Sequence, residues 1–368
     1  MKVMLVVTSL MGAGHLQRTL IIARAIRNAG GRPIIVSGGR PIPYLETDDV
    51  PIEHIPPLSA DRFDYSRLMT PENVADEAYM RSRAVRLVEL FEEHQPDALV
   101  TELFPFGRRA LSAEFLTLLA QARGKAMVFA SIRDVLEPKR KAKRAEETAL
   151  RLRRWYDGVL VHGDPTLIGL EATWPLADNF EHMIRYTGYV AEPSPAADPS
   201  SADEVLVSVG GGVIGRNLLE TAVRAAAISP YKWRLRVGGA DAPEHVEKLK
   251  SLAEDPSVIV EAAASDYRSR LAACACSVSL LGYNTCTDLL LADRPSVICP
   301  MREGDEREQR IRAEAFRKLS GFHQLDDVTP QALAGLVDYA INDDQRSPHG
   351  VNMDGAAETA RLLLTAGG

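Results

Sequence analysis

The side chain best placed for chemistry is His15, which follows a glycine turn near the start of the chain. Gly12 and Gly14 lie in this turn, directly after the apolar run Val3–Val7, and Arg18 comes one helical turn beyond the histidine. A strand, a glycine turn and a helix start place backbone N–H groups and a helix dipole against an anion. The positive helix end also disfavours a charged imidazole, so we expect a neutral His15 that takes a proton from a hydroxyl or a water. Arg18 would bind a phosphate or a carboxylate. The alternative to a base at position 15 is that His15 only contacts a phosphate or forms a hydrogen bond within the turn.

A second glycine turn follows the apolar run Val205–Val209 and opens another helix. The turn consists of Gly210, Gly211, Gly212 and Val213. Together with Gly215 it matches the G-x-G-x-x-G pattern, so an NAD-dependent oxidoreductase is one interpretation. That pattern also needs an acidic residue at the end of the next strand, and Asp241 comes too late in the chain to supply it. The turn therefore predicts phosphate binding in general, with the oxidoreductase as a more distant alternative.

Polar residues gather at two further helix starts in the second half of the chain. The first start carries Gly282, Asn284, Thr285 and Asp288, and the second carries Gln309 and Arg310. A carboxylate at Asp288 can accept two hydrogen bonds from a vicinal diol, and Gln309 can bridge sugar hydroxyls. The alternative is that Asp288 and Gln309 lie on solvated helix faces and that Asn284 and Thr285 are ordinary helix caps. Arg310 either adds positive charge beside a sugar or pairs with Glu306.

Short β-branched runs alternate with helical patterns through both halves of the chain. Expected strands cover 2–8, 33–37, 98–101, 126–131 and 158–161, then 204–209, 233–237, 257–260, 276–280 and 295–299. Expected helices cover 15–29, 72–94, 110–122 and 141–155, then 215–228, 243–253, 266–273, 284–292, 306–318 and 330–342. Continuous apolar strands that alternate with helices indicate parallel sheets covered on both faces. The predicted fold class is α/β, with two Rossmann-like doubly wound domains that face a central cleft.

The length of 368 residues exceeds what one hydrophobic core usually serves, so two domains are expected. Residues 192–203 are rich in proline and serine and lack apolar periodicity, which is typical of a linker. We expect an N-terminal acceptor-binding domain over 1–191 and a C-terminal domain over 204–345. The tail over 346–368 carries a final helix at 354–365 that we expect to return to the first domain.

Composition limits the class of protein. The chain is 46% hydrophobic and has a net charge of −7, which argues against wholesale nucleic-acid binding. No run approaches eighteen apolar residues, and the opening segment reads as a first strand, not as a signal peptide. The four cysteines lack the paired spacing of a zinc site, so we expect free buried thiols in a cytoplasmic protein. Its oligomeric state is not predictable from these features.

Taken in order along the chain, these motifs resemble the MurG-like group of GT-B glycosyltransferases. The resemblance implies that the second domain binds a nucleotide-sugar donor, most simply a UDP-sugar, and that no other cofactor is needed. It places the diphosphate on Gly210 to Val213, the ribose on Asp288 and the sugar on Gln309. It also implies transfer with inversion by a single displacement. Two departures leave the donor sugar open: the acid of the family is usually glutamate, and its paired glutamines become Glu308-Gln309-Arg310 here.

Several readings remain beside a transferase. The Gly-His-x-x-Arg sequence also resembles PseG-like nucleotide-sugar hydrolases, in which His15 would activate water. A non-catalytic sugar-nucleotide sensor has the same fold. The chain contains no Asp-x-Asp sequence, so we expect catalysis without a metal ion. In that case backbone amides and a cation such as Arg236 or Arg310 would stabilise the leaving group.

MurG-like enzymes approach an anionic membrane, so the resemblance implies that the basic segment 139–154 could make a peripheral contact with the inner face of a membrane. It could also bind an anionic soluble acceptor, or be a solvated helix face and nothing more.

Overall fold

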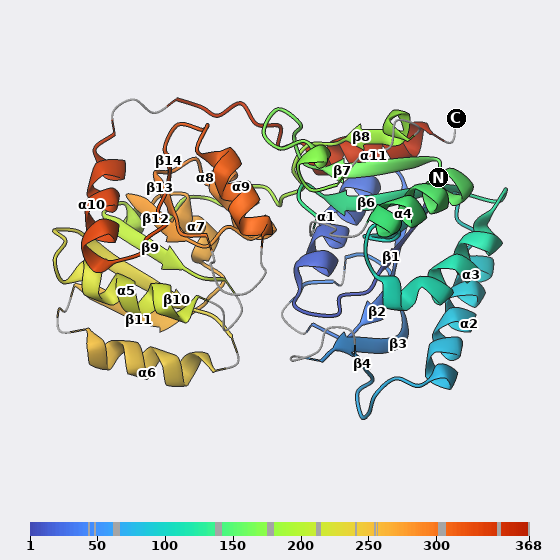
Figure 1. Ribbon diagram of the computed structural model, residues 1–368, viewed down its shortest axis with the longest axis horizontal. Coiled ribbons are helices and arrows are strands. Elements are labelled where there is room, and N and C mark those ends of the chain that lie inside the picture. The colour runs from blue at the N-terminus through green and yellow to red at the C-terminus, as the bar shows by residue number, and fades with distance from the viewer. Residues whose placement is uncertain are drawn as a thin grey trace. The chain divides into compact units, whose positions relative to one another are not determined.

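The computed structural model describes the chain except residues 43–44, 48, 62–66, 137–141, 175–179, 211–214, 240, 254, 256, 301–306, 344–346 and 367–368. The chain divides into two compact units, Met1–Ala191 together with Asn352–Gly368, and Glu192–Val351. Figure 1 shows that each unit is a sheet covered by helices. The segment 192–203 lies in the second unit, where Asp198 N–H donates to the Ser269 carbonyl and the short 3-10 helix Pro199–Ser201 follows.

Unit 1 contains an eight-stranded sheet in the order β4-β3-β2-β1-β5-β6-β7-β8. Its strands are β1 (Lys2–Val7), β2 (Arg32–Gly39), β3 (Ile52–Ala60), β4 (Leu68–Met69), β5 (Ala98–Glu102), β6 (Met127–Arg133), β7 (Gly158–His162) and β8 (Ile184–Tyr186). Its helices are α1 (Gly14–Asn28), α2 (Glu77–His94), α3 (Ser112–Ala122), α4 (Ala142–Trp155) and α11 (Gly355–Thr365). The strands pair in parallel, except that β4 runs antiparallel to β3.

The continuous apolar run of β1 is explained by burial on both faces of this sheet. Met4 and Val6 pack in a core shared with α2, α3 and α4, whereas Val3, Leu5 and Val7 pack in a second core with α1 and α11. Successive side chains of a strand point to opposite faces, so a strand buried on both faces needs no polar alternation. The final helix α11 reaches this second core through Ala360 and Leu363 and lies beside α1 (Figure 1).

Unit 2 contains a six-stranded sheet in the order β11-β10-β9-β12-β13-β14, all parallel. Its strands are β9 (Glu204–Ser208), β10 (Lys232–Val237), β11 (Val258–Ala262), β12 (Cys276–Ser279), β13 (Ser296–Ile298) and β14 (Phe322–Gln324). Its helices are α5 (Arg216–Ala226), α6 (Ala242–Leu252), α7 (Tyr267–Leu271), α8 (Tyr283–Ala292), α9 (Glu308–Phe316) and α10 (Pro330–Ile341). The predicted α/β class with two Rossmann-like sheets is confirmed.

In both sheets the strand order reverses beside the first strand of the unit. The reversal falls between β1 and β5 in unit 1 and between β9 and β12 in unit 2. Open α/β sheets bind ligands at the carboxyl ends of the strands at such a point. The fold therefore directs attention to the loops that follow β1 and β5, and to those that follow β9 and β12.

Three strands of unit 1, β3, β4 and β8, were not predicted from the sequence, and one helix begins later than predicted. The strand Ile52–Ala60 was not predicted, because Pro56 and Pro57 interrupt its apolar pattern; both are tolerated near the edge, where its only further neighbour is the two-residue β4. The helix predicted from residue 72 begins at Glu77. Residues before it form a turn in which the Thr70 hydroxyl accepts from the Asn73 amide, and Asp76 then caps the helix by accepting from the amide of Tyr79.

Candidate functional site

His15 lies at the start of α1, in the loop that leaves the carboxyl end of β1. Gly12 adopts φ +62°, which a glycine tolerates without strain, and Gly14 is the first residue of α1. The His15 side chain is 18% exposed, so one edge of the ring reaches the surface of unit 1. Burial lowers the pKa of His15 to about 4, although the neighbouring Glu102 opposes that shift. His15 is therefore neutral at physiological pH.

Glu102, the last residue of β5, faces His15 across the point where the strand order reverses. Its Oε1 atom lies 2.6 Å from His15 Nδ1 and 2.6 Å from Arg18 Nη2. The carboxylate is only 3% exposed, and burial by itself would raise the pKa of Glu102. The hydrogen bond from His15 and the charges of Arg18 and Arg108 outweigh burial and hold the pKa of Glu102 below its usual range. Glu102 is thus ionised.

An ionised carboxylate is an acceptor only, and this fixes the tautomer of His15. Nδ1 must carry the proton and donate it to Glu102, so Nε2 of the neutral ring keeps its lone pair. A carboxylate that orients an imidazole and leaves its other nitrogen free is the arrangement of a general base. Arg18, expected to meet a ligand anion or a carboxylate, meets the carboxylate of Glu102.

Neither Glu102 nor its neighbour Arg108 was predicted from the sequence. Nothing in the local sequence connects Glu102 with His15, because 87 residues separate them. The sequence feature that could have indicated Glu102 is an acidic residue at the end of an apolar strand. Because β5 is parallel to β1 and adjacent to it, the carboxyl ends of both strands lie at one edge of the sheet.

A second histidine of unit 1, His162, is fully buried at the end of β7. Its Nε2 lies 2.8 Å from the Ser131 hydroxyl and its Nδ1 lies 2.9 Å from the Thr187 hydroxyl. Burial lowers the pKa of His162 to about 3. Both ring nitrogens are engaged by hydroxyl groups, so His162 holds β6, β7 and the chain after β8 together and is not a second base.

In unit 2, the loop from β12 into α8 and the start of α9 come together. Gln309 Oε1 accepts a hydrogen bond from the Leu281 amide at 3.2 Å, and the buried Arg312 donates to the Leu281 carbonyl at 2.8 Å. Gly282 is the N-cap of α8 in an extended conformation, and Asn284 and Thr285 lie half-buried in its first turn. The first turn of α8 thus offers backbone N–H groups of the kind that bind a phosphate.

Asp288 lies further along α8 and pairs with a cation of α7. Its Oδ1 accepts from Arg268 Nε at 2.9 Å, and Arg268 Nη2 also donates to the Glu192 carbonyl at 2.7 Å. Burial raises the pKa of Asp288 to about 6, while Arg268 opposes that shift. The Asp288 side chain keeps 20% of its surface exposed, so its carboxylate has one fixed partner and an edge open to a further donor.

The second glycine turn is described only at its margins. Gly210 adopts φ +81° and Gly215 φ +84°, and both conformations favour glycine. Gly211, Gly212 and Val213 lie outside the described residues, as does Glu306, the expected partner of Arg310. Arg310 itself is exposed on α9.

Asp241 and Arg236, two charged residues that follow the second glycine turn in the chain, each pair with a residue of opposite charge. Asp241 accepts from Arg216 Nη2 at 2.6 Å and is therefore engaged by an arginine. Arg236, expected to stabilise a leaving group, is buried and donates to both carboxylate oxygens of Asp266, at 2.6 and 2.7 Å. Arg236 thus has a structural partner and is a poor choice for that role.

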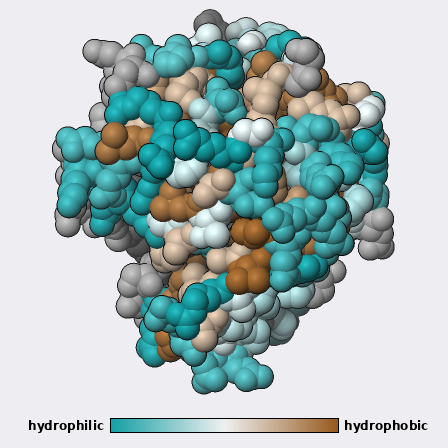
Figure 2. Space-filling model, turned by 90° about the vertical axis from the view of Figure 1, so that its right-hand side faces the viewer, coloured by the Kyte–Doolittle hydropathy of each residue, from teal (hydrophilic) through white to brown (hydrophobic). Residues whose placement is uncertain are grey.

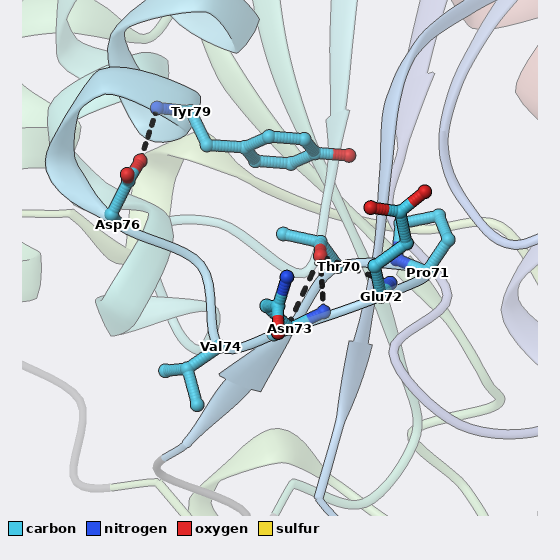
Figure 3. A pocket seen from close by; sticks show the side chains of 7 residues that line it. All are labelled: Thr70, Pro71, Glu72, Asn73, Val74, Asp76 and Tyr79. Carbon is cyan, nitrogen blue, oxygen red and sulfur yellow. Dashed lines mark hydrogen bonds between the residues drawn. The ribbon is translucent and has the colours of Figure 1, made fainter.

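A cavity of about 410 Å³ opens between the turn after β4 and the start of α2. Figure 3 shows the ring of Tyr79, the carboxylate of Glu72 and the Thr70 turn that line it. Tyr79 is fixed by donating its hydroxyl to the Pro57 carbonyl at 2.9 Å.

The surface adds few specialised features. Figure 2 shows one side of the molecule as a mainly hydrophilic mosaic with small separate hydrophobic areas. Helix α4 exposes basic side chains, among them Arg153 and Arg154, together with Leu150, which is 58% exposed.

The described part of the chain contains no helix long and apolar enough to cross a membrane. It also contains no group of three histidine, cysteine or acidic residues arranged to hold a metal ion. The four cysteines are free and buried, as predicted.

Comparison with known proteins identifies the fold. No protein-family model matches the chain, and no curated protein sequence matches it. Solved structures match over almost its whole length. MurG from Acinetobacter baumannii superposes with a TM-score of 0.60 at 14% identity, covering 98% of this chain and 94% of that one. The glycosyltransferase VinC, solved in complex with dTDP, gives a TM-score of 0.63 at 15% identity, covering 99% and 94%.

A plant structure matches equally well. UGT2 from Phytolacca americana, complexed with UDP-2-fluoro-glucose and pterostilbene, gives a TM-score of 0.65 at 13% identity, covering 100% of this chain and 95% of that one. The three structures, one bacterial MurG and two other glycosyltransferases, share one architecture. The chain therefore has the GT-B fold, as its resemblance to the MurG-like group implied.

Proposed function

We propose that the protein is a metal-independent, inverting glycosyltransferase that moves a sugar from a nucleotide-sugar, most simply a UDP-sugar, to an acceptor hydroxyl. The observation that carries the proposal is the contact of 2.6 Å between His15 Nδ1 and Glu102 Oε1 at the switch point of unit 1. This contact presents an unprotonated Nε2 where an α/β sheet binds ligands. The GT-B fold is compatible with sugar transfer, and the residues of the site are what support this function.

In the proposed reaction His15 Nε2 removes the proton from the acceptor hydroxyl. The acceptor oxygen then forms a bond to the anomeric carbon while the bond from that carbon to the diphosphate oxygen breaks. The proton resides on His15, whose positive charge Glu102 stabilises, and the nucleoside diphosphate leaves with the bonding electron pair. Attack from the face opposite the leaving group inverts the anomeric centre.

The donor would bind in unit 2. The first turn of α8, from Gly282 to Thr285, supplies backbone donors for the diphosphate, together with the turn from Gly210 to Val213. The open edge of the Asp288 carboxylate would accept from the ribose, and Gln309, held beside Leu281, would meet the sugar. Amide groups and a helix dipole can stabilise the leaving diphosphate, so the proposed reaction needs no divalent ion.

The same base could activate water, which would make the protein a nucleotide-sugar hydrolase. A product assay separates the two. Wild-type protein is incubated with a UDP-sugar, with and without a pool of acceptors and with EDTA present, and free sugar, free UDP and glycosylated product are quantified. Acceptor-dependent release of UDP supports the transferase, and equal release of sugar and UDP without acceptor supports the hydrolase. Binding of the UDP-sugar without any release of UDP, both with and without acceptors, would indicate a non-catalytic sugar-nucleotide sensor.

We also propose that the basic face of α4 contacts an anionic membrane surface, as the MurG-like resemblance suggested. Exposed Arg153 and Arg154 would approach lipid headgroups while Leu150 meets the interface. Sedimentation with vesicles of anionic and of neutral lipid tests this. Binding to anionic vesicles alone, reduced in an Arg153→Gln/Arg154→Gln variant, is expected. Equal recovery in the supernatant with both vesicles would overturn it.

A further inference from the structure

Arg108 carries hydrogen-bond donors that the described protein groups do not satisfy. The residue lies in the loop after β5, and its side chain is 11% exposed. Among the described residues, neither its Nε nor its Nη2 has a hydrogen-bond partner, although both atoms are buried. Its nearest carboxylate oxygen, Glu102 Oε2, lies 3.8 Å from Nη2, which is beyond hydrogen-bond distance, and Oε2 also has no partner in the described part of the chain. A buried guanidinium without acceptors is costly unless something else supplies them.

Two further guanidinium groups lie near Arg108. Burial lowers the pKa of the Arg108 guanidinium, and the charges of Arg133 and Arg18 lower it further. Glu102 is the carboxylate that opposes them. The next carboxylate, Asp134, accepts from the Val135 amide and from the Tyr189 hydroxyl. Guanidinium groups that repel one another in a buried place are stabilised by an anion that enters between them.

The backbone of Arg108 has a conformation that residues other than glycine rarely adopt. Arg108 has φ +54° and Leu103, at the other end of the same loop, has φ +65°. A non-glycine residue in this region costs about 1 kcal/mol or more, and such residues cluster at functional sites. The loop leaves the carboxyl end of β5, and Arg133 ends the adjacent strand β6, so both guanidinium groups lie at the edge of the sheet that carries His15.

We propose that Arg108, with Arg133, forms a subsite for an anionic oxygen group of the acceptor, a phosphate or a carboxylate, beside His15. The anion accepts from Nε and Nη2 of Arg108. The acceptor is thereby held with a hydroxyl near His15 Nε2, and a neutral acceptor is disfavoured because it leaves the guanidinium donors unpaired. This assignment of the acceptor class rests on the proposed function, whereas the anion site itself does not.

Binding of inorganic phosphate tests the subsite in the full-length protein. Phosphate is titrated with saturating UDP present, which fills the donor site of unit 2, and the signal is the His15 Cε1–H NMR resonance of selectively labelled protein. The negative charge of an anion beside the neutral ring shifts this resonance directly at fixed pH, without protonation of His15. We expect saturable binding to the wild type and binding at least tenfold weaker in Arg108→Gln. The matched control Arg32→Gln, at an exposed arginine that begins β2, should bind phosphate as the wild type does.

The arms of the experiment separate the possible failures. Absence of a phosphate-dependent shift in the wild type, or equal affinity in wild type and Arg108→Gln, overturns the subsite. Arg108→Lys, which keeps the charge but not the forked donors, should bind with intermediate affinity, and a rescue to the wild-type value would contradict the assigned geometry. If Arg108→Gln weakens UDP binding tenfold, the anion belongs to the donor and the acceptor assignment is wrong. If UDP binds neither the wild type nor the variants, while phosphate binding still depends on Arg108, the subsite is supported and the proposed function is wrong.

Discussion

Glu102 Oε1 lies 2.6 Å from both His15 Nδ1 and Arg18 Nη2, so one buried carboxylate orients the imidazole and also pairs with a guanidinium. The Glu102–His15 contact joins the end of β5 to the start of α1 across the reversal of strand order. Burial keeps the imidazole neutral although Glu102 favours its protonated form, and the contact of Glu102 with Nδ1 leaves Nε2 as the nitrogen with the lone pair.

Replacing His15 by alanine removes the proposed base while leaving the donor site of unit 2 intact. We expect kcat to fall by about 100-fold to 10,000-fold, with the dissociation constant for UDP unchanged. Steady-state kinetics and calorimetry measure the two quantities. His182→Ala, at an exposed histidine of the same unit, is the control. A His15→Ala protein with wild-type kcat would exclude the base assignment.

The Glu102→Gln variant tests the orienting carboxylate. The amide cannot balance the charges of Arg18 and Arg108, so the variant should lose about 3–5 kcal/mol of stability, as when one partner of a buried ion pair is removed. The loss of a charged acceptor for Nδ1–H should also lower kcat by about tenfold or more. Chemical denaturation and kinetics at a temperature where the variant is folded report the two effects. Glu93→Gln, at a side chain that is 58% exposed on α2, should change neither.

The sequence predicted His15 and missed Glu102 for the same physical reason. Local patterns report local structure, so the strand, glycine turn and helix around His15 could be read directly. The contact with Glu102 depends on β5 lying next to β1, which a single sequence does not state. Strand Ile52–Ala60 was missed because its two prolines hide the apolar pattern. The helices that carry Asp288 and Gln309 were predicted from the sequence, but the pairing of Asp288 with Arg268 depends on the packing of α7 against α8.

Asp288 and Arg268 should affect donor binding more than turnover. Asp288→Asn keeps the shape but removes the charge, so we expect KM for the UDP-sugar to rise about tenfold or more while kcat changes less than threefold. Arg268→Lys loses the contacts of the guanidinium with the Glu192 carbonyl and should raise KM in the same direction. A fall in kcat with constant KM in both variants would contradict the assigned role.

Activity should depend on pH in two separate ways. The pKa of Asp288 is raised to about 6, so its carboxylate becomes protonated, and donor KM should rise, as pH falls from 7 to 5. The pKa of His15 is lowered to about 4, so the base stays neutral through that range and kcat should decline only near pH 4. Full pH profiles of kcat and KM test this separation. A decline of kcat centred on pH 6 to 7 would mean that His15 titrates normally.

A structural ion pair of unit 1 provides a stability prediction independent of catalysis. Arg83 and Glu114 are fully buried between α2 and α3, with both guanidinium–carboxylate contacts at 2.8 Å. Glu114→Gln leaves the Arg83 charge uncompensated and should cost about 3–5 kcal/mol. Glu77→Gln breaks the exposed pair with Arg81 and should cost less than about 0.5 kcal/mol. Similar urea midpoints for the two variants would show that the buried pair is not needed.

The most direct test of the central claim is a thermal-shift screen with UDP-, GDP-, dTDP- and CMP-sugars and with NAD(H), all with EDTA present. A nucleotide-sugar transferase should be stabilised by one nucleoside diphosphate, expected to be UDP, and by one of its sugars, and the chelator should not matter. Stabilisation by NAD(H) alone, with no response to any sugar nucleotide, would contradict the account.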